Sequence, residues 1–371
     1  MPMVDIFGTL GPSCDEEEVL KAMFKEGMTG IRINLSHVML ADCKESIRRI
    51  QRAAKAIGIT PSILIDMQGP ELRIGDLKEP LELEEGVILH IRQETAPGIA
   101  AESAPCVNLD NSLCIASEKA AGTDTEYAPG IDREKAICLD LRILRKLSPG
   151  QDVLLDDGRI LAVVTKAKEN AAELKVLRGG ILKGRKSIAI KGMNIDDMPA
   201  LTEHDLENLK CAKELGITGV MQPFVRSADD LTEVRKAAGE NLKIYAKIEN
   251  MTGVHNLKSF LPYADEIIIA RGDLGNAMPL WELPRTQKDI AKICREHNKP
   301  FMVVTQMLAS MEHSKVPTRA EVSDIYNAVA DGASSVMVTG ETAVGEYPVE
   351  VIRYLSKTAG AAADACSVYK R

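Results

Sequence analysis

Three charged residues near the middle of the chain have types and spacing that could bind a divalent cation and a phosphoryl group. Lys247 and Glu249 lie two positions apart in an apolar run, so on a strand they share one face. The next apolar run, 267–270, ends in Arg271-Gly-Asp273. If the two runs form neighbouring parallel strands, Glu249 and Asp273 meet. Two carboxylates suit Mg²⁺, and a lysine beside them would neutralise a transferring phosphoryl group. The alternative is a structural salt bridge at a strand end.

The runs around these residues alternate between strand-like and helical patterns. Strands are expected at 3–8, 29–35, 61–67, 217–222, 242–248, 264–270, 300–305 and 333–339. Helices are expected at about 15–27, 39–57, 202–214 and 347–364, with Ser13 or Asp15 capping the first. Three strands precede residue 73 and five follow residue 187. Eight βα units are the count of a closed (β/α)₈ barrel, so the sequence predicts an α/β protein with a TIM barrel.

The stretch between these strands has a different pattern. Short alternating segments, punctuated by Gly, Pro and Asp, occur for example at 81–90, 153–158 and 173–177. This is an all-β pattern, typical of a small β-barrel. The predicted domains are therefore a barrel domain over 1–72 and 188–371, and a small all-β domain over 73–187, inserted after strand 3.

Composition and charge exclude several classes of function. The net charge is −8, from 46 basic and 54 acidic residues without a long basic run, which argues against nucleic acid as a partner. No apolar run is long enough to span a membrane, and the first residues have no signal-peptide core. The eight cysteines are scattered without a C-x-x-C pair, as expected for reduced thiols in a cytoplasmic protein.

Polar clusters fall where the predicted strands end, which is where (β/α)₈ barrels place their chemistry. The clusters are Arg32-x-Asn34-x-Ser36-His37, Asp66-x-x-Gly-Pro-Glu71, Lys247-x-Glu249, Arg271-Gly-Asp273, Thr305-Gln306 and Thr339-Gly-Glu341-Thr342. One cluster could be an accidental helix cap. Six at corresponding ends favour a functional site.

Ordered motifs over nearly the whole length of the chain resemble those of the pyruvate kinase family. They include Arg-Ile-Asn-Leu-Ser-His (32–37), Gly-Pro-Glu-Leu-Arg (69–73), Ala-Lys-Ile-Glu-Asn (246–250), Ala-Arg-Gly-Asp-Leu-Gly (270–275), Thr-Gln-Met-Leu (305–308) and Gly-Glu-Thr-Ala (340–343). The resemblance implies a glycolytic phosphotransferase that transfers a phosphoryl group from phosphoenolpyruvate to ADP, giving pyruvate and ATP. It also implies that the inserted domain is a lid over the nucleotide.

The resemblance further implies a role for individual residues. Catalytic roles fall to Lys247, Arg32, Thr305 and Thr339, the last as the hydroxyl implicated in protonating the enolate. Substrate-binding roles fall to Gly272, Asp273, Thr305 and Lys247, and nucleotide-side roles to Asn34, His37, Arg73 and Lys186. Mg²⁺ (or Mn²⁺) would be held by Glu249 and Asp273, and K⁺ by Asn34, Ser36, Asp66 and the carbonyl of Met67.

The chain departs from the family pattern at several positions. Met67 and Gln68 resemble the K⁺-independent branch, whereas Glu71 fits the K⁺-dependent one, so the K⁺ requirement is left open. Pro223 replaces the family's serine, and Val344 replaces its lysine. These changes keep two alternatives open: a paralogous Mg²⁺-dependent enzyme acting on another enolpyruvate or phosphorylated substrate, and a non-catalytic ligand-binding descendant.

The end of the chain leads to two further expectations. A short Ser-Val-Tyr-Lys-Arg tail follows the last predicted helix, so the family's C-terminal domain and its sugar-phosphate effector site are expected to be absent. Any homo-oligomer would then form through the barrel, around Trp281 and 317–327.

Overall fold

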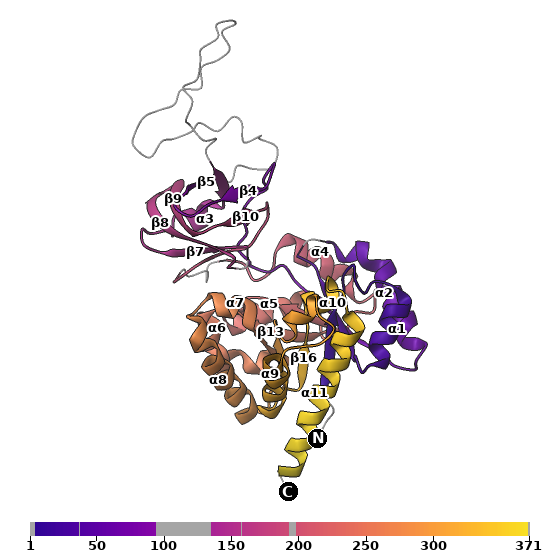
Figure 1. Cartoon of the computed structure of the whole chain (residues 1–371). Coiled ribbons are helices and arrows are strands. Elements are labelled where there is room, and N and C mark those ends of the chain that lie inside the picture. The colour runs from indigo at the N-terminus through magenta and orange to yellow at the C-terminus, as the bar shows by residue number, and fades with distance from the viewer. Residues whose placement is uncertain (1–3, 37, 94–134, 157, 193–197, 370–371) are drawn as a thin grey trace, which may run out of the picture. The chain divides into compact units, whose positions relative to one another are not determined.

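The structure is a computed structural model that describes residues 4–36, 38–93, 135–156, 158–192 and 198–369. Internal contacts divide the chain into two units (Figure 1). One unit comprises Met1–Glu71 and Ile195–Arg371, and the other comprises Leu72–Asn194.

The first unit contains a closed barrel of eight parallel strands, which confirms the predicted (β/α)₈ fold. In chain order the strands are β1 (Asp5–Thr9), β2 (Gly30–Asn34), β3 (Ser62–Asp66), β12 (Gly219–Gln222), β13 (Lys243–Ile248), β14 (Glu266–Ala270), β15 (Phe301–Val304) and β16 (Ser335–Met337). Around the barrel they follow the order β1-β16-β15-β14-β13-β12-β3-β2. Each of the eight predicted apolar runs forms or overlaps one of these strands.

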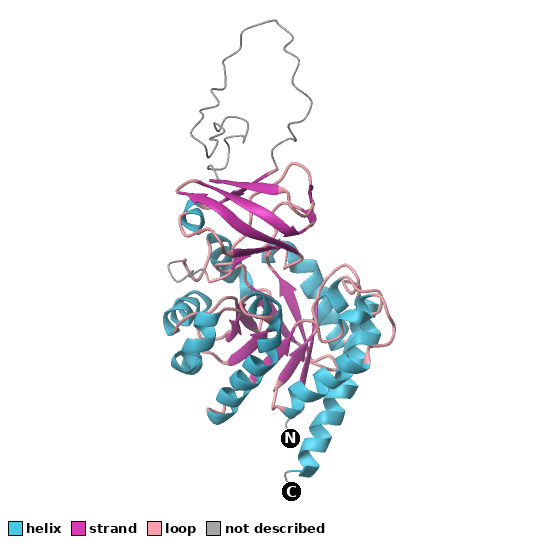
Figure 2. Ribbon diagram, turned by 60° about the vertical axis from the view of Figure 1, so that its left-hand side comes forward, coloured by secondary structure: helices cyan, strands magenta, loops and turns pink. Residues whose placement is uncertain are grey.

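Helices enclose the strands of this unit (Figure 2). The α-helices are α1 (Glu17–Lys25), α2 (Lys44–Lys55), α4 (Glu203–Ala212), α5 (Ala228–Ala238), α6 (Met251–Phe260), α7 (Arg271–Asn276), α8 (Leu283–Glu296), α9 (Arg319–Ala330), α10 (Gly340–Ala343) and α11 (Pro348–Tyr369). Short 3₁₀ turns are η1 (Leu40–Cys43), η2 (Leu261–Tyr263), η3 (Leu280–Glu282) and η4 (Ala309–Glu312).

The predicted cap of the first helix is wrong. Helix α1 has Glu16 at its N-cap position, and no side chain caps it by a hydrogen bond. Asp15 instead accepts hydrogen bonds from Ser46 and Arg49 of α2, at 2.8 and 2.7 Å. The carboxylate that could have capped α1 therefore joins α1 to α2, because a guanidinium offers a stronger, charge-assisted partner.

The side chains of the barrel strands alternate between two apolar layers. A large layer fills the space between strands and helices, and a smaller one fills the barrel interior with residues such as Phe7, Leu64 and Tyr245. Because side chains alternate along a strand, the residue two positions beyond an interior residue also faces inward. Asp66 and Lys247 stand two positions beyond Leu64 and Tyr245, at the carboxyl ends of β3 and β13.

The second unit is built mainly of strands. They are β4 (Leu81–Leu83), β5 (Ile88–Gln93), β6 (Ala136–Leu139), β7 (Asp152–Leu155), β8 (Ile160–Lys168), β9 (Ala171–Arg178), β10 (Gly180–Leu182) and β11 (Ile188–Ile190), with the short helix α3 (Leu141–Leu144). The described strands form a six-stranded sheet, β11-β7-β8-β9-β5-β6, and a two-stranded sheet, β10-β4, where a small β-barrel was expected. Since β11 pairs with β7, this unit extends beyond residue 187, where the sequence-based boundary falls.

Candidate active site

Lys247, with 13% of its side chain exposed, lies at the centre of the polar residues at the carboxyl end of the barrel. The Nζ of Lys247 is 3.0 Å from the Oε1 of Glu249, and 3.1 and 3.2 Å from the two carboxylate oxygens of Asp66. Burial alone would lower the pKa of Lys247, but the carboxylates of Asp66 and Glu249 raise it above its usual range. Lys247 is therefore a permanent cation at neutral pH, suited to stabilising negative charge and not to removing protons.

Asp66 joins this lysine to a second cation. Arg32, on the neighbouring strand β2, donates to the Oδ2 of Asp66 from Nε at 2.8 Å and from Nη2 at 2.6 Å. Burial would raise the pKa of Asp66, but Lys247 and Arg32 together hold it below its usual value. The Arg32 Nη1 also reaches the hydroxyl of Thr9 at 3.4 Å. Asp66 is thus an ionised carboxylate that orients both candidate phosphoryl-binding cations.

Glu249 is nearly inaccessible, with 3% of its surface exposed. Its Oε2 accepts a hydrogen bond of 2.9 Å from the backbone N–H of Phe224, which follows β12. Burial raises the pKa of Glu249; Lys247 opposes the rise and Asp66 adds to it. This carboxylate therefore lacks full charge compensation in the protein alone, and a bound cation would supply it.

Asp273 and Gly272 lie in the first turn of α7, directly after β14. The negative charge of Asp273 contributes to the raised pKa of Lys247, which places Asp273 in the same electrostatic environment. A Cβ built at Gly272 would lie 3.2 Å from the Cγ2 and 3.7 Å from the Oγ1 of Thr305. The predicted substrate-binding residues Gly272 and Thr305 therefore lie side by side.

Thr339 follows β16 and is held by a buried carboxylate. Its backbone N–H donates to the Oε2 of Glu341 at 2.7 Å, and its hydroxyl lies 3.3 Å from the same oxygen. The other oxygen of Glu341 accepts the backbone N–H of Leu308 at 3.1 Å. Glu341 thus links the loops after β15 and β16, the two loops that carry Thr305 and Thr339.

The predicted K⁺ ligands of the first unit lie at the ends of β2 and β3. Asn34 is the register partner of Asp66, and its Oδ1 accepts the backbone N–H of Ser36 at 3.2 Å. The side chain of Met67 packs in the outer apolar layer, so only its carbonyl is available as a ligand. These oxygens have the chemistry that a monovalent cation needs, although two cationic side chains already bind Asp66.

The predicted nucleotide-side residues are divided between the units. In the second unit, the backbone of Arg73 bridges to Ser187, and its Nη1 donates to the carbonyl of Arg185 at 2.8 Å. Lys186 forms an ion pair of 2.6 Å with Asp156. Asn34 lies in the first unit, and His37 lies outside the described residues. Arg73 and Lys186 therefore share one edge of their own unit.

Sequence reasoning missed one buried residue beside the site. Asp205 is fully buried, and its carboxylate accepts the backbone N–H groups of Gln68 and Gly69 at 2.8 and 2.9 Å. It also forms the capping box of α4 with Thr202. The pattern Thr-x-x-Asp indicates the capping box, but nothing in the sequence indicates that Asp205 also accepts the N–H groups of Gln68 and Gly69. Asp205 ties the loop after Asp66 to the start of α4.

The residues around Lys247 fit a divalent cation. Three carboxylates, Asp66, Glu249 and Asp273, face two cations, Arg32 and Lys247, which leaves an excess of negative charge. Glu249 and Asp273 offer the hard oxygen ligands that Mg²⁺ prefers. Among the described residues no group of three or more His, Cys, Asp or Glu is placed to hold a metal. This is compatible with Mg²⁺, which usually takes one or two protein carboxylates and completes its shell with water and substrate oxygens.

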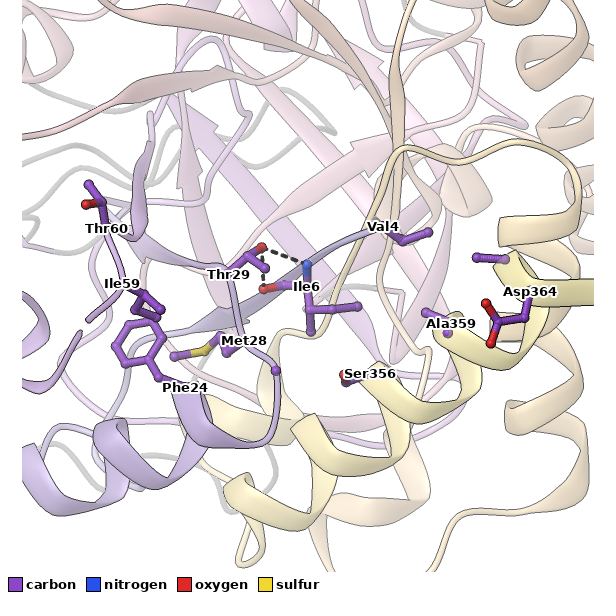
Figure 3. A pocket seen from close by; sticks show the side chains of 13 residues that line it. Val4, Ile6, Phe24, Met28, Thr29, Ile59, Thr60, Ser356, Ala359 and Asp364 are labelled. Atoms are coloured by element: carbon purple, nitrogen blue, oxygen red, sulfur yellow. Dashed lines mark hydrogen bonds between the residues drawn. The ribbon is translucent and has the colours of Figure 1, made fainter. Parts of the chain in front are cut away.

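A separate cavity of about 600 Å³ lies at the opposite end of the barrel (Figure 3). Val4, Thr29 and Thr60, which precede β1, β2 and β3, line it together with Ser356 and Asp364 of α11. None of the predicted site residues lines this cavity.

In the described part of the chain, no helix is long and apolar enough to cross a membrane.

Comparisons with known proteins agree with this geometry. A family model described as "Pyruvate kinase, barrel domain" matches residues 1–123 and 97–352. The chain is 35% identical to a pyruvate kinase of Mycobacterium intracellulare over 94% of its own length and 68% of the relative's. It is 34% identical to one of Chlamydia pneumoniae, covering 94% and 66%, and 32% identical to one of Staphylococcus saprophyticus, covering 100% and 58%. The chain thus spans about two thirds of the length of these relatives.

The fold and the site define a (β/α)₈-barrel enzyme with a largely buried lysine and arginine beside two buried carboxylates, Asp66 and Glu249, at the carboxyl ends of its strands. The chain belongs to the pyruvate kinase family.

Proposed function

We propose that the chain transfers a phosphoryl group from phosphoenolpyruvate to ADP, giving pyruvate and ATP. One observation carries this proposal: a largely buried, permanently charged Lys247 is held between Asp66 and Glu249 at the carboxyl end of a pyruvate kinase barrel. A cation so placed lowers the energy of a transferring phosphoryl group by compensating the negative charge on its oxygens.

The proposed reaction assigns a task to each group. Lys247 and Arg32 bind the phosphoryl oxygens, while the bond from phosphorus to the enol oxygen breaks and a bond to the terminal phosphate oxygen of ADP forms. Gly272 and Asp273 offer backbone N–H groups to the substrate carboxylate, and Thr305 adds a hydroxyl. The enolate then takes a proton on its methylene carbon, with the Thr339 hydroxyl beside it.

Glu249 and Asp273 are the proposed ligands of Mg²⁺ or Mn²⁺. When bound, the divalent ion neutralises charge on the substrate carboxylate and phosphoryl oxygens. Asn34, Ser36, Asp66 and the Met67 carbonyl are the proposed K⁺ ligands. The K⁺ requirement stays a prediction for measurement, because Asp66 already carries two cationic partners. Asn34, His37, Arg73 and Lys186 are proposed to act on the nucleotide side, with the second unit as the lid.

A second candidate is a paralogous enzyme acting on another enolpyruvate. It is favoured by Pro223, which immediately precedes the Phe224 N–H that binds Glu249, and by Val344, which is 63% exposed where the family has a lysine. An exposed valine at a lysine position indicates that this part of the site has changed.

A substrate panel tests both candidates. The full-length protein with Mg²⁺ is given ADP and either phosphoenolpyruvate or other phosphorylated enols and acids, and ³¹P NMR follows the phosphoryl group. The proposal predicts ATP formation from phosphoenolpyruvate at the highest kcat/KM. A preference for another substrate, shifted toward phosphoenolpyruvate by Val344→Lys or Pro223→Ser, would establish the second candidate instead.

A further inference from the structure

Thr305 has a backbone conformation that its side chain opposes. Its φ is +83°, and the next residue, Gln306, has a φ of +56°. A β-branched residue in this region is a genuine outlier, because its side chain crowds the backbone. Such residues persist only where surrounding contacts hold them, and they cluster at functional sites. Thr305 therefore depends on surrounding contacts to keep this conformation.

Arg271 supplies two of them. Its Nε and Nη2 donate to the carbonyl of Thr305 at 3.2 and 2.7 Å. The third nitrogen of the same guanidinium, Nη1, binds Asp324 of α9, whose two carboxylate oxygens lie 2.8 and 2.7 Å away. Only 13% of the Arg271 side chain is exposed. A planar fork held at one side by a carboxylate can fix a carbonyl in direction as well as position.

Holding this carbonyl restrains rotation about the N–Cα bond of Thr305, and that rotation sets where the Thr305 side chain points. In the observed conformation that side chain lies against Gly272, the residue whose backbone N–H is proposed to bind the substrate carboxylate. A return of Thr305 to an ordinary negative φ would turn the peptide and move the hydroxyl away from Gly272. Arg271 adjoins Gly272 in sequence, so one short segment would both bind the substrate and orient its partner loop.

We propose that Arg271 is a positioning residue for the reaction. It clamps the Thr305 backbone in the left-handed conformation that keeps the Thr305 hydroxyl beside Gly272, and it does so without touching substrate. The inference rests on the proposed function for the substrate-binding roles of Thr305 and Gly272, but the clamp itself is a property of the protein alone.

Two variants test the clamp. Arg271→Met removes all donors, and Arg271→Lys keeps the charge next to Asp324 but cannot bind both partners with a planar fork. Crystal structures of both should show Thr305 with a negative φ. Kinetics should show a kcat about a hundredfold lower, as expected for a reacting group displaced by about 1 Å, with an unchanged KM for ADP.

Arg235→Lys is the matched control. Arg235 also bridges backbone carbonyls and an aspartate, donating to Leu242 and Asp265 at 2.6 and 2.8 Å, at the amino end of β13. The Arg235→Lys variant should lower the unfolding midpoint about as much as Arg271→Lys does, but its kcat should stay within about twofold of the wild-type value.

The inference and the proposed function fail in different ways. If Thr305 keeps a φ near +83° in Arg271→Met, the clamp is refuted whatever the activity. If Arg271→Met does not fold, the same result in Arg271→Lys refutes the clamp. A kcat in Arg271→Lys equal to that of the control refutes the positioning role. Absence of pyruvate formation by the wild-type protein refutes the proposed function, while the crystal structures still decide the clamp.

Discussion

Replacing Asp66 by asparagine should destabilise the barrel and damage the site together. Asp66 is 2% exposed and forms ion pairs with both Arg32 and Lys247. Removing one partner of a buried ion pair costs about 3–5 kcal/mol, because the remaining charges stay buried without compensation. Asparagine keeps one acceptor oxygen, and Lys247 keeps Glu249, so we expect about 3 kcal/mol. For a domain of this size that corresponds to a fall of about 6–12 °C in the unfolding midpoint.

The destabilisation should depend on pH in a defined direction. The pKa of Asp66 is lower in the folded protein than in the unfolded chain, so its charge stabilises the fold above the unfolded pKa of about 3.9. This contribution is lost as the pH falls through the folded pKa. The difference in stability between the wild-type protein and Asp66→Asn should therefore be constant near neutral pH and shrink below about pH 4.

Denaturant unfolding at several pH values measures both effects, with circular dichroism as the probe. Arg226→Lys is a suitable control, because it perturbs a buried ion pair with Asp230 on the same unit while retaining its charge. A loss below about 1 kcal/mol at pH 7, or a difference that grows as the pH falls below 4, would refute the electrostatic account of Asp66.

Three further variants test the roles of Glu249, Asp205 and Trp281. Glu249→Gln should raise the unfolding midpoint at neutral pH without Mg²⁺, because burial raises the pKa of Glu249 and makes its charge unfavourable above that pKa. The same variant should lose the stabilisation that Mg²⁺ gives the wild-type protein. An unchanged response to Mg²⁺ in thermal melts would contradict the role of Glu249 as a ligand. Asp205→Asn should lose the acceptor of one loop amide and speed hydrogen exchange at Gln68 or Gly69 at least about tenfold, as measured by NMR. Thr202→Val, which removes the hydroxyl that caps α4 and donates to Asp205 but leaves the Asp205 carboxylate in place, should leave both amides protected. Trp281→Glu should turn any homo-oligomer into monomer, because Trp281 is 81% exposed; light scattering that shows the same mass for both proteins would remove this surface from the proposal.

The sequence predicted the barrel well because its signals are local. Each strand is an apolar run bounded by polar residues, and eight such runs with helical patterns between them admit few folds. The proximity of Lys247 and Glu249 followed from their spacing alone, and the structure joins them at 3.0 Å. The mutual contacts of Arg32, Asp66 and Lys247 needed only the further step that strand ends meet at one edge of the barrel.

What the sequence could not predict depends on backbone geometry and on choices between partners. The Phe224 N–H that binds Glu249 leaves no trace in residue type, and neither does the positive φ of Thr305. Ser13 or Asp15 was expected to cap α1, but no side chain caps it, and Asp15 pairs with Arg49, a residue 34 positions away. The start of α1 is adjacent to Asp15 in sequence, whereas Arg49 comes within reach of Asp15 only because α1 packs against α2.

The most direct test of the central claim is pyruvate formation from phosphoenolpyruvate and ADP with Mg²⁺, with and without K⁺, by the wild-type protein and by Lys247→Met. The account predicts clear turnover by the wild-type protein and a loss of about a thousandfold or more in the variant, which retains the length of the side chain but not its charge. The comparison with and without K⁺ decides the cation requirement. No turnover by the wild-type protein, or similar turnover by Lys247→Met, would contradict the account.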